Sequence, residues 1–338
     1  PENIGKFKEK FYQRLAFDEI FSTFLVNSEI RKKIKKVKKT QKKISLDKQN
    51  EIISKLNFIL TNDQKRTLEE INKDLSSSNK MFRLLQGDVG SGKTIVSLLS
   101  AFNTVNSGFQ VALMAPTEIL ARQHFLLAKK IFNNKVKIEL ISGKSSYKNK
   151  KDILNDLSKH RIDIIIGTHA IFQKKVEFKN LGLIIIDEQH KFGVNQRKKL
   201  SDKGGKNCDI LLMTATPIPR TLTMTVYGDM DISIIHEKPK MRKPVKTYSK
   251  LENKIEDVIK FIKKEINLGN QIFWVCPLID ESKKIDHESA IKKYNFLTKI
   301  FPKKVSLLHG KTSIDEKEII LNNFLKKKIR YIGVNNHN

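Results

Sequence analysis

The stretch LLQGDVGSGKTIVSLL, residues 84–99, decides the fold of this chain. An apolar run ends at Leu85, a glycine-rich loop follows, and the apolar spacing of IVSLLSAF begins a helix directly after the loop. The loop fills the pattern G-x-x-x-x-G-K-[ST], in which backbone N–H groups at a helix N-terminus surround a β-phosphate. The sequence therefore predicts a strand, a loop and a helix that together bind a nucleoside triphosphate.

The residue types in this loop suit a triphosphate and its metal ion. Lys93 places a positive charge near the β- and γ-phosphates, and the Thr94 hydroxyl can ligate Mg²⁺. Glycines let the backbone approach the phosphates closely. The expected binding residues in the loop are Gly87, Asp88, Val89, Gly90, Ser91, Gly92, Lys93 and Thr94.

Short apolar runs alternate with amphipathic segments on both sides of the loop. The runs are MFRLLQ, VALMAP, IDIIIGT, LGLIIIDE and DILLMTAT. This alternation predicts a parallel sheet with helices on both faces. A second series, QIFWVCPLI, VSLLHG and IRYIGV, follows the proline-containing stretch KPKMRKPVKT, which we expect to link two domains.

Two adjacent carboxylates follow the apolar run LIII. A buried strand that ends in Asp187 and Glu188 would bring both side chains to the edge of a sheet. Asp187 can hold Mg²⁺, directly or through water, while Glu188 can activate the water that attacks the γ-phosphate. Because a structural strand end rarely needs two acidic residues, we assign the pair to catalysis.

The stretch FILTNDQ, residues 58–64, offers an aromatic ring and an amide upstream of the loop. Phe58 could stack on an adenine, and Gln64 could hydrogen-bond to it. Thr61 as a helix cap would explain part of this pattern without any ligand.

Composition gives weaker information than the motifs on the domains, partners and location of the chain. At 338 residues it is long enough for two domains, and its formal charge of +29 suits a polyanionic partner, either nucleic acid or an anionic membrane surface. The lysine bias of an AT-rich coding sequence would produce the same charge. No run approaches the roughly 18 apolar residues of a membrane span, and neither Cys208 nor Cys276 has a metal-ligand neighbour. We expect a cytoplasmic protein with reduced thiols, and a fragment or processed product because it begins at Pro1.

The first residues predict one or two helices and then a charged connector. Apolar residues recur at helical spacing in residues 6–44, and the segment ends in RKKIKKVKKTQKK. Such a basic run is usually a solvated face, so we give it only modest weight as a DNA contact. We expect a helical and basic linker over 1–47, a first domain over 48–240 and a second domain over 241–338.

Five motifs together resemble a known family. GDVGSGKT, APTEILARQH, GTHA, DEQHKFGVNQR and TATPIPRT are similar, in order and distance, to the motor motifs of superfamily 2 helicases. DEQHKFGVNQR with MTATPIPRTL resembles RecG-type branched-DNA helicases and the related transcription-repair coupling translocase. RLAFDE, TMTVYGDMDISII and VCPLIDESKK favour the RecG type.

The resemblance implies an α/β fold, a RecA-like P-loop helicase motor with one complete parallel-sheet domain, a truncated second RecA-like domain and an N-terminal helical linker. It implies ATP and Mg²⁺, with Lys93, Asp187 and Glu188 as catalytic residues and Thr94 and Asp187 at the metal. Four residues outside the loop would complete the nucleotide site, namely Phe58, Gln64, Gln189 and His190. Three would couple nucleotide state to DNA binding, namely Thr214, Ala215 and Thr216. Six would contact the DNA backbone, namely Pro116, Thr117, Arg122, Gly143, Thr168 and His169.

The resemblance further implies an ATP-dependent helicase or translocase acting on branched DNA, at replication forks and Holliday junctions, in DNA repair and recombination. Alternating closure of two motor domains would drive translocation. We expect a monomer without membrane partners. Two alternatives stay open, a transcription-repair coupling translocase motor and a non-catalytic fragment that binds ATP or DNA.

The last residues depart from the family pattern. Family members continue after a stretch like FLKKKIR into a strand with a Ser-Thr-Thr segment and then into a motif of catalytic arginines. The sequence YIGVNNHN, residues 331–338, resembles neither. One codon choice for these residues, shifted by one base, encodes Ile-Leu-Val-Ser-Thr-Thr-Thr. We therefore hypothesise a frameshift near Arg330, with a natural fragment as the alternative, and expect weak or no ATP turnover because an arginine finger contributes about 10³–10⁵ in rate.

Overall fold

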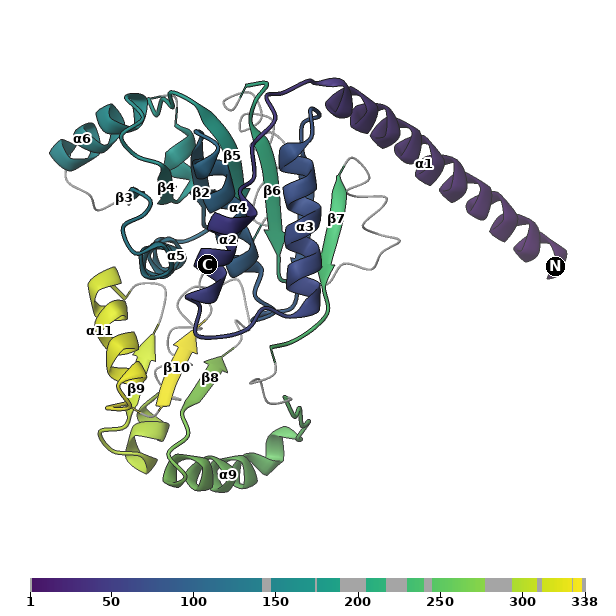
Figure 1. Ribbon diagram of the computed structural model, residues 1–338. Coiled ribbons are helices and arrows are strands. Elements are labelled where there is room, and N and C mark those ends of the chain that lie inside the picture. The colour runs from purple at the N-terminus through teal and green to yellow at the C-terminus, as the bar shows by residue number, and fades with distance from the viewer. Residues whose placement is uncertain are drawn as a thin grey trace. The chain divides into compact units, whose positions relative to one another are not determined.

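The structure, a computed structural model, describes residues 2–141, 147–173, 175–188, 205–216, 230–239, 245–276, 294–308, 312–329 and 331–335. The chain forms two compact units, Pro1–Lys243 and Pro244–Asn338. In the described parts, the first unit holds a seven-stranded sheet and the second a three-stranded sheet, and every strand pairing is parallel (Figure 1). The predicted parallel sheets are therefore confirmed.

The sheet of the first unit has the strand order β3-β4-β2-β5-β6-β1-β7. Its strands are β1 (Phe82–Gly87), β2 (Gln110–Met114), β3 (Ile138–Ile141), β4 (Ile164–Gly167), β5 (Leu181–Ile186), β6 (Asp209–Thr214) and β7 (Asp231–Ile235). The strands β2, β4, β5 and β6 are buried along their whole length, which explains their continuous apolar sequences. Because all strands are parallel, their carboxyl ends meet at one edge.

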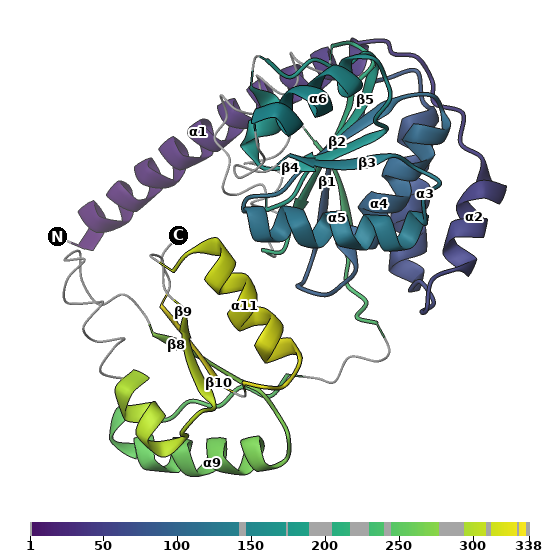
Figure 2. The same ribbon diagram turned by 90° about the vertical axis from the view of Figure 1, so that its left-hand side faces the viewer.

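Helices cover both faces of this sheet (Figure 2). They are α2 (Leu46–Ser54), α3 (Asn62–Ser76), α4 (Lys93–Asn106), α5 (Glu118–Phe132) and α6 (Tyr147–Ser158), with a short 3₁₀ helix at His169–Phe172. Consecutive strand residues face opposite sides, so Leu85 packs with α2, α3, α4 and α5 while Leu84 packs in the core that includes Leu157 of α6. Cys208 is buried in this second core, and burial raises the pKa of its thiol to about 12.

The N-terminal helix α1 (Glu2–Lys36) confirms the predicted helical segment. In the described residues, no helix has both the length and the apolar character required to cross a bilayer. Residues 37–43, which follow α1, form what we call the basic strap.

The structure corrects the interpretation of this basic run as a solvated face at two of its lysines, Lys39 and Lys42. Lys39 and Lys42 are fully buried, and both ammonium groups donate to the same oxygen, Oδ2 of Asp209, at 2.6 Å each. The other oxygen of Asp209 accepts the Met81 N–H at 2.7 Å. Burial lowers the pKa of Lys39, and Asp209 opposes that shift. One carboxylate at the start of β6 therefore compensates two buried cations.

Backbone hydrogen bonds hold the same strap to the amino end of the sheet and its helices. The Lys39 N–H donates to the Ser78 carbonyl at 2.9 Å, and the Lys42 N–H donates to the Leu75 carbonyl at 3.1 Å. The Lys80 N–H in turn donates to the Val37 carbonyl at 3.2 Å. The strap is therefore an ordered part of the first unit.

Replacing Asp209 should show how much its ion pairs with Lys39 and Lys42 stabilise the first unit. Asp209→Asn would leave two buried ammonium groups without a counter-charge, so we expect the free energy of unfolding to fall by about 3–5 kcal/mol. Urea denaturation of the chain measures this. Lys38→Met is the matched control, because Lys38 lies on the same strap but is exposed, and it should cost less than about 1 kcal/mol. Equal stability of the two variants would contradict a stabilising role for the buried ion pairs of Asp209.

The second unit has the strand order β8-β10-β9. Its strands are β8 (Ile272–Cys276), β9 (Val305–Leu308) and β10 (Tyr331–Asn335), and its helices include α9 (Ile255–Asn267) and α11 (Ile314–Leu325). A 3₁₀ turn at Glu252–Lys254 precedes α9, and residues 294–300 are also helical. Ile259, Ile262 and Ile266 of α9 pack with Leu297 and Phe301. The three strands predicted after residue 270 are confirmed.

Candidate functional site

The loop between β1 and α4 has the backbone that its glycines permit. Gly90 and Gly92 adopt φ values of 76° and 93°, which L side chains rarely tolerate. A Cβ at Gly92 would lie 2.2 Å from Nε2 of Gln64, and a Cβ at Gly87 would lie 2.5 Å from Oγ of Ser91. The glycines are therefore required by conformation and by space.

Lys93 begins α4 and turns back over the loop. Its Nζ donates to the carbonyls of Gly87 at 2.7 Å and Asp88 at 3.1 Å. Burial lowers the pKa of this ammonium, while the carboxylates of Asp187, Glu188 and Asp88 oppose the shift. A buried cation thus lies among carbonyl and carboxylate oxygens at the carboxyl edge of the sheet.

The acidic pair lies at the same edge, because β5 is separated from β1 only by β6. The Asp187 N–H donates to the Met114 carbonyl at 2.8 Å, which aligns it with the end of β2. Oδ1 of Asp187 accepts the Glu188 N–H at 3.0 Å, and Oδ2 contacts Nε2 of His124 at 2.8 Å. Glu188 has a φ of 52°, in the left-handed region where a residue other than glycine is strained.

The predicted coupling residues lie between the loop and the acidic pair. Thr214 ends β6 and is in register with Gln86 of β1, directly before the loop. The Thr216 N–H donates to Oγ1 of Thr214 at 3.2 Å, so the chain turns sharply across Ala215. Their location suits a coupling role, which stays a prediction.

A hollow of about 460 Å³ adjoins the loop. Its walls come from the segment before α3, the loop, α5 and the start of the linker, and they consist of Lys55, Leu56, Asn57, Phe58, Ile59, Gln64, Gly92, Thr94, Ile95, Leu127, Lys130, Ile131 and Pro239. Phe58 and Gln64, the two residues predicted to bind adenine, therefore line one cavity with Thr94. Its size and largely apolar walls suit a nucleobase.

Gln64 has a further role that the sequence only partly indicated. Its Oε1 accepts the Thr61 N–H at 3.0 Å, and Oγ1 of Thr61 accepts the Gln64 N–H, so the predicted cap at Thr61 is confirmed as a capping box. Its Nε2 donates to the Ser91 carbonyl at 2.7 Å, inside the loop. One N–H and one lone pair of the amide remain for a base.

Contacts from the residues after β7 were not predicted. Lys238 pairs with Asp88 of the loop at 2.7 Å. Oδ2 of Asp63 accepts the N–H groups of His236 and Glu237 at 2.8 and 3.0 Å. The start of the linker is therefore bound to both the loop and α3, and no periodic pattern in the sequence signals these pairs.

A second hollow, of about 630 Å³, lies at the same sheet edge beyond β2 and β4. It is lined by Pro116, Thr117, Glu118, Ile141, Lys150, Lys151, Leu154, Thr168, His169, Ala170, Gln173, Lys175 and Val176. Four predicted DNA-binding residues, namely Pro116, Thr117, Thr168 and His169, thus come together in one place, and the sequence missed the three lysines beside them. Arg122 is exposed on α5. Gly143, Gln189 and His190 lie outside the described residues.

The parallel sheet, the loop and the acidic pair at its carboxyl edge are the features of a RecA-like P-loop fold. The DEAD/DEAH box helicase family matches residues 61–225. The ATP-dependent DNA helicase RecG of Thermotoga maritima is 44% identical over 319 residues, covering 94% of this chain and 41% of the relative. The RecG of Bacillus subtilis is 48% identical over 275 residues, and the match covers 80% of this chain and 40% of that relative.

A solved structure of RecG bound to a three-way DNA junction is 39% identical, with a TM-score of 0.79, and covers 96% of this chain and 42% of that one. The chain therefore belongs to the RecG family of superfamily 2 helicases, and the predicted RecA-like fold is confirmed. It spans about two fifths of the length of these relatives.

Alanine substitutions at two glycines should separate backbone strain from loop geometry. Gly92 and Gly108 both have positive φ, but a Cβ at Gly108 meets nothing within 4 Å. Both variants should lose about 1 kcal/mol of stability from strain. Only Gly92→Ala should also weaken ATP binding, by about 10-fold or more, because its Cβ displaces the Gln64 amide. Calorimetric titration with ATP measures this, and equal ATP affinity of the two variants would argue against the loop as the binding site.

Proposed function

We propose that the chain provides an ATP-hydrolysing motor that acts on branched DNA. The observation that carries this proposal is the meeting of Lys93, Asp187 and Glu188 at one sheet edge, beside a hollow that suits adenine. The relatives named ATP-dependent DNA helicase support the same activity.

The residues present fit ATP and Mg²⁺. Oγ of Ser91 is buried in the loop and has no hydrogen-bond partner among the described residues. Lys93 can exchange its carbonyl partners for phosphate oxygens, and the Thr94 hydroxyl and the Asp187 carboxylate supply the oxygen ligands that Mg²⁺ prefers. When bound, Mg²⁺ neutralises charge on the phosphates. Glu188 would then orient and deprotonate the attacking water.

Substitutions of Lys93 and Glu188 should affect ATP binding and ATP hydrolysis separately. Lys93→Ala should abolish measurable ATP binding, because it removes the cation that faces the phosphates. Glu188→Gln should keep ATP binding and slow turnover by about 10²-fold or more, because an amide cannot accept the proton. Binding is measured on this chain, and turnover on a chain extended through the remainder of a second motor domain.

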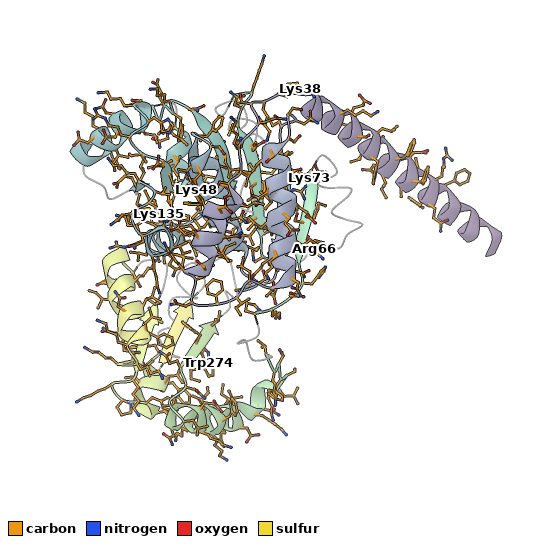
Figure 3. All side chains as sticks on the ribbon, in the orientation of Figure 1. Lys38, Lys48, Arg66, Lys73, Lys135 and Trp274 are labelled. Carbon is orange, nitrogen blue, oxygen red and sulfur yellow. The ribbon has the colours of Figure 1, made fainter. Side chains whose placement is uncertain are left out.

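Lys48→Ala is the matched control for the charge change, since Lys48 is exposed on α2 (Figure 3). It should leave binding and turnover unchanged. Normal hydrolysis by Glu188→Gln would remove Glu188 from the role of base.

We propose that the second hollow, with its three lysines, contacts the DNA backbone. Lys151, Lys175 and the hydroxyls of Thr117 and Thr168 can bind phosphates without distinguishing bases. The solved RecG bound to a three-way DNA junction supports a branched substrate. The compact units, divided after Lys243, support the predicted domain boundary near residue 240.

The roles predicted for Arg122 and for Thr214 to Thr216 belong to this proposal. Four expectations stay predictions. They are the boundary between the linker and the first domain at residues 47 and 48, the monomeric state, the cytoplasmic location and the frameshift near Arg330.

Salt dependence should reveal which lysines neutralise phosphates. DNA affinity should be insensitive to sequence and fall steeply with salt, and Lys151→Ala with Lys175→Ala should reduce the slope of log K against log[salt] by about 2. Fluorescence anisotropy with forked DNA at several salt concentrations measures the slope. The control is Lys48→Ala with Lys73→Ala. These lysines are exposed on α2 and α3, which pack on the sheet face opposite to α6 (Figure 3). A slope equal to that of the control pair would contradict DNA binding at this hollow.

A further inference from the structure

His124 of α5 forms a hydrogen bond with Asp187 of the acidic pair, and it has no role in the proposed chemistry so far. Its Nε2 lies 2.8 Å from Oδ2 of Asp187, although the two residues are 63 positions apart in the sequence. The side chains are only 8% and 12% exposed. An ionised carboxylate can only accept hydrogen bonds, so Nε2 must carry the proton and donate it.

This contact completes the support of the Asp187 carboxylate. Oδ1 already accepts the Glu188 N–H at 3.0 Å, so both oxygens are held and the plane of the carboxylate is defined. Each oxygen keeps a lone pair for a metal ion or its water. Partners of this kind orient metal-ligating carboxylates in proteins, and their loss typically weakens metal binding by 10–100-fold.

The helix that carries His124 also borders both hollows. Leu127, Lys130 and Ile131 of α5 line the hollow beside the loop, while Glu118 and the N-cap residue Thr117 line the lysine-rich hollow. About two helical turns, or about 10 Å along the axis, separate Thr117 from His124. Thr117 and His124 therefore lie on one continuous helix, which joins the lysine-rich hollow to the Asp187 carboxylate.

We infer that His124 is a positioning residue that orients the Asp187 carboxylate for Mg²⁺ and connects that orientation, through α5, to DNA bound at the lysine-rich hollow. The inference rests on the proposed ATP and DNA binding. A purely structural His124 would fill space between α5 and the sheet, and its replacement would affect Mg²⁺ and nucleotide alike.

Two substitutions separate these roles. The Gln amide reaches about as far as Nε2 of His and can donate to Asp187, whereas Leu fills similar space without a donor. In this chain, fluorescent ADP is titrated with and without Mg²⁺, and the Mg²⁺ concentration that gives half-maximal binding is measured. His124→Leu should raise this concentration by about 10-fold or more, and His124→Gln should stay within about 3-fold of the unmodified chain. Without Mg²⁺, the unmodified chain and both variants should bind ADP equally, because Lys93 and the loop are unchanged.

Forked DNA supplies the second measurement. It should lower the Mg²⁺ concentration for half-maximal binding in the unmodified chain and in His124→Gln, but not in His124→Leu. If His124→Leu does not fold, His124→Asn replaces it, because the shorter Asn amide cannot reach Asp187.

An unchanged Mg²⁺ requirement in His124→Leu, in a chain whose ADP binding is lost on Lys93→Ala, would overturn the inference and leave the proposed function intact. A His124→Gln variant that behaves like His124→Leu would also overturn it, since the hydrogen bond would then not be the cause. Failure of the unmodified chain to bind ADP at all would instead overturn the proposed function, and the inference with it.

Discussion

Parallel pairing of β5, β6 and β1 is the constraint on which the site depends. Parallel strands end at the same edge, so the loop after β1, the threonines after β6 and the acidic pair after β5 must meet there. Burial of these strands on both faces leaves their polar residues at the ends, where Lys93 lies close enough to Asp187 and Glu188 to respond to their charge. A register shift in any of the three strands would separate these groups.

The opposite edge of the sheet also contains buried charge, but there it is used for stability. Asp209 at the start of β6 holds Lys39 and Lys42 of the basic strap. A part of the lysine excess is therefore structural, and net charge overstates what is available to a polyanion. The lysines beside Thr117 and Thr168 are a better indication of a nucleic-acid surface, because they gather at one hollow with residues that were predicted to contact DNA.

Helix α5 is the element that the two hollows share. Its N-terminal end borders the lysine-rich hollow, its later turns border the hollow beside the loop, and His124 between them contacts Asp187. A motor of the proposed kind must relate the state of its nucleotide to its hold on DNA. A single helix in contact with both regions provides a direct physical connection, without requiring any change in the sheet.

The sequence by itself determined the elements and the chemistry that depend on neighbouring residues. Apolar runs predicted the strands, the loop pattern predicted the phosphate site with Lys93 and Thr94, and Thr61 was correctly expected to cap a helix. These features are local, because a loop or a cap is made by residues a few positions apart. Such spacing is visible in a single sequence.

Only the tertiary structure decided which distant residues become partners. Asp209 pairs with lysines 167 and 170 positions away, and His124 contacts Asp187 from 63 positions away. The sequence predicted a solvated strap and left His124 without a role, because nothing periodic marks a long-range pair. The chain must first fold into the sheet before burial gives these charges and hydrogen bonds their partners, and that is the physical reason the local sequence could not indicate them.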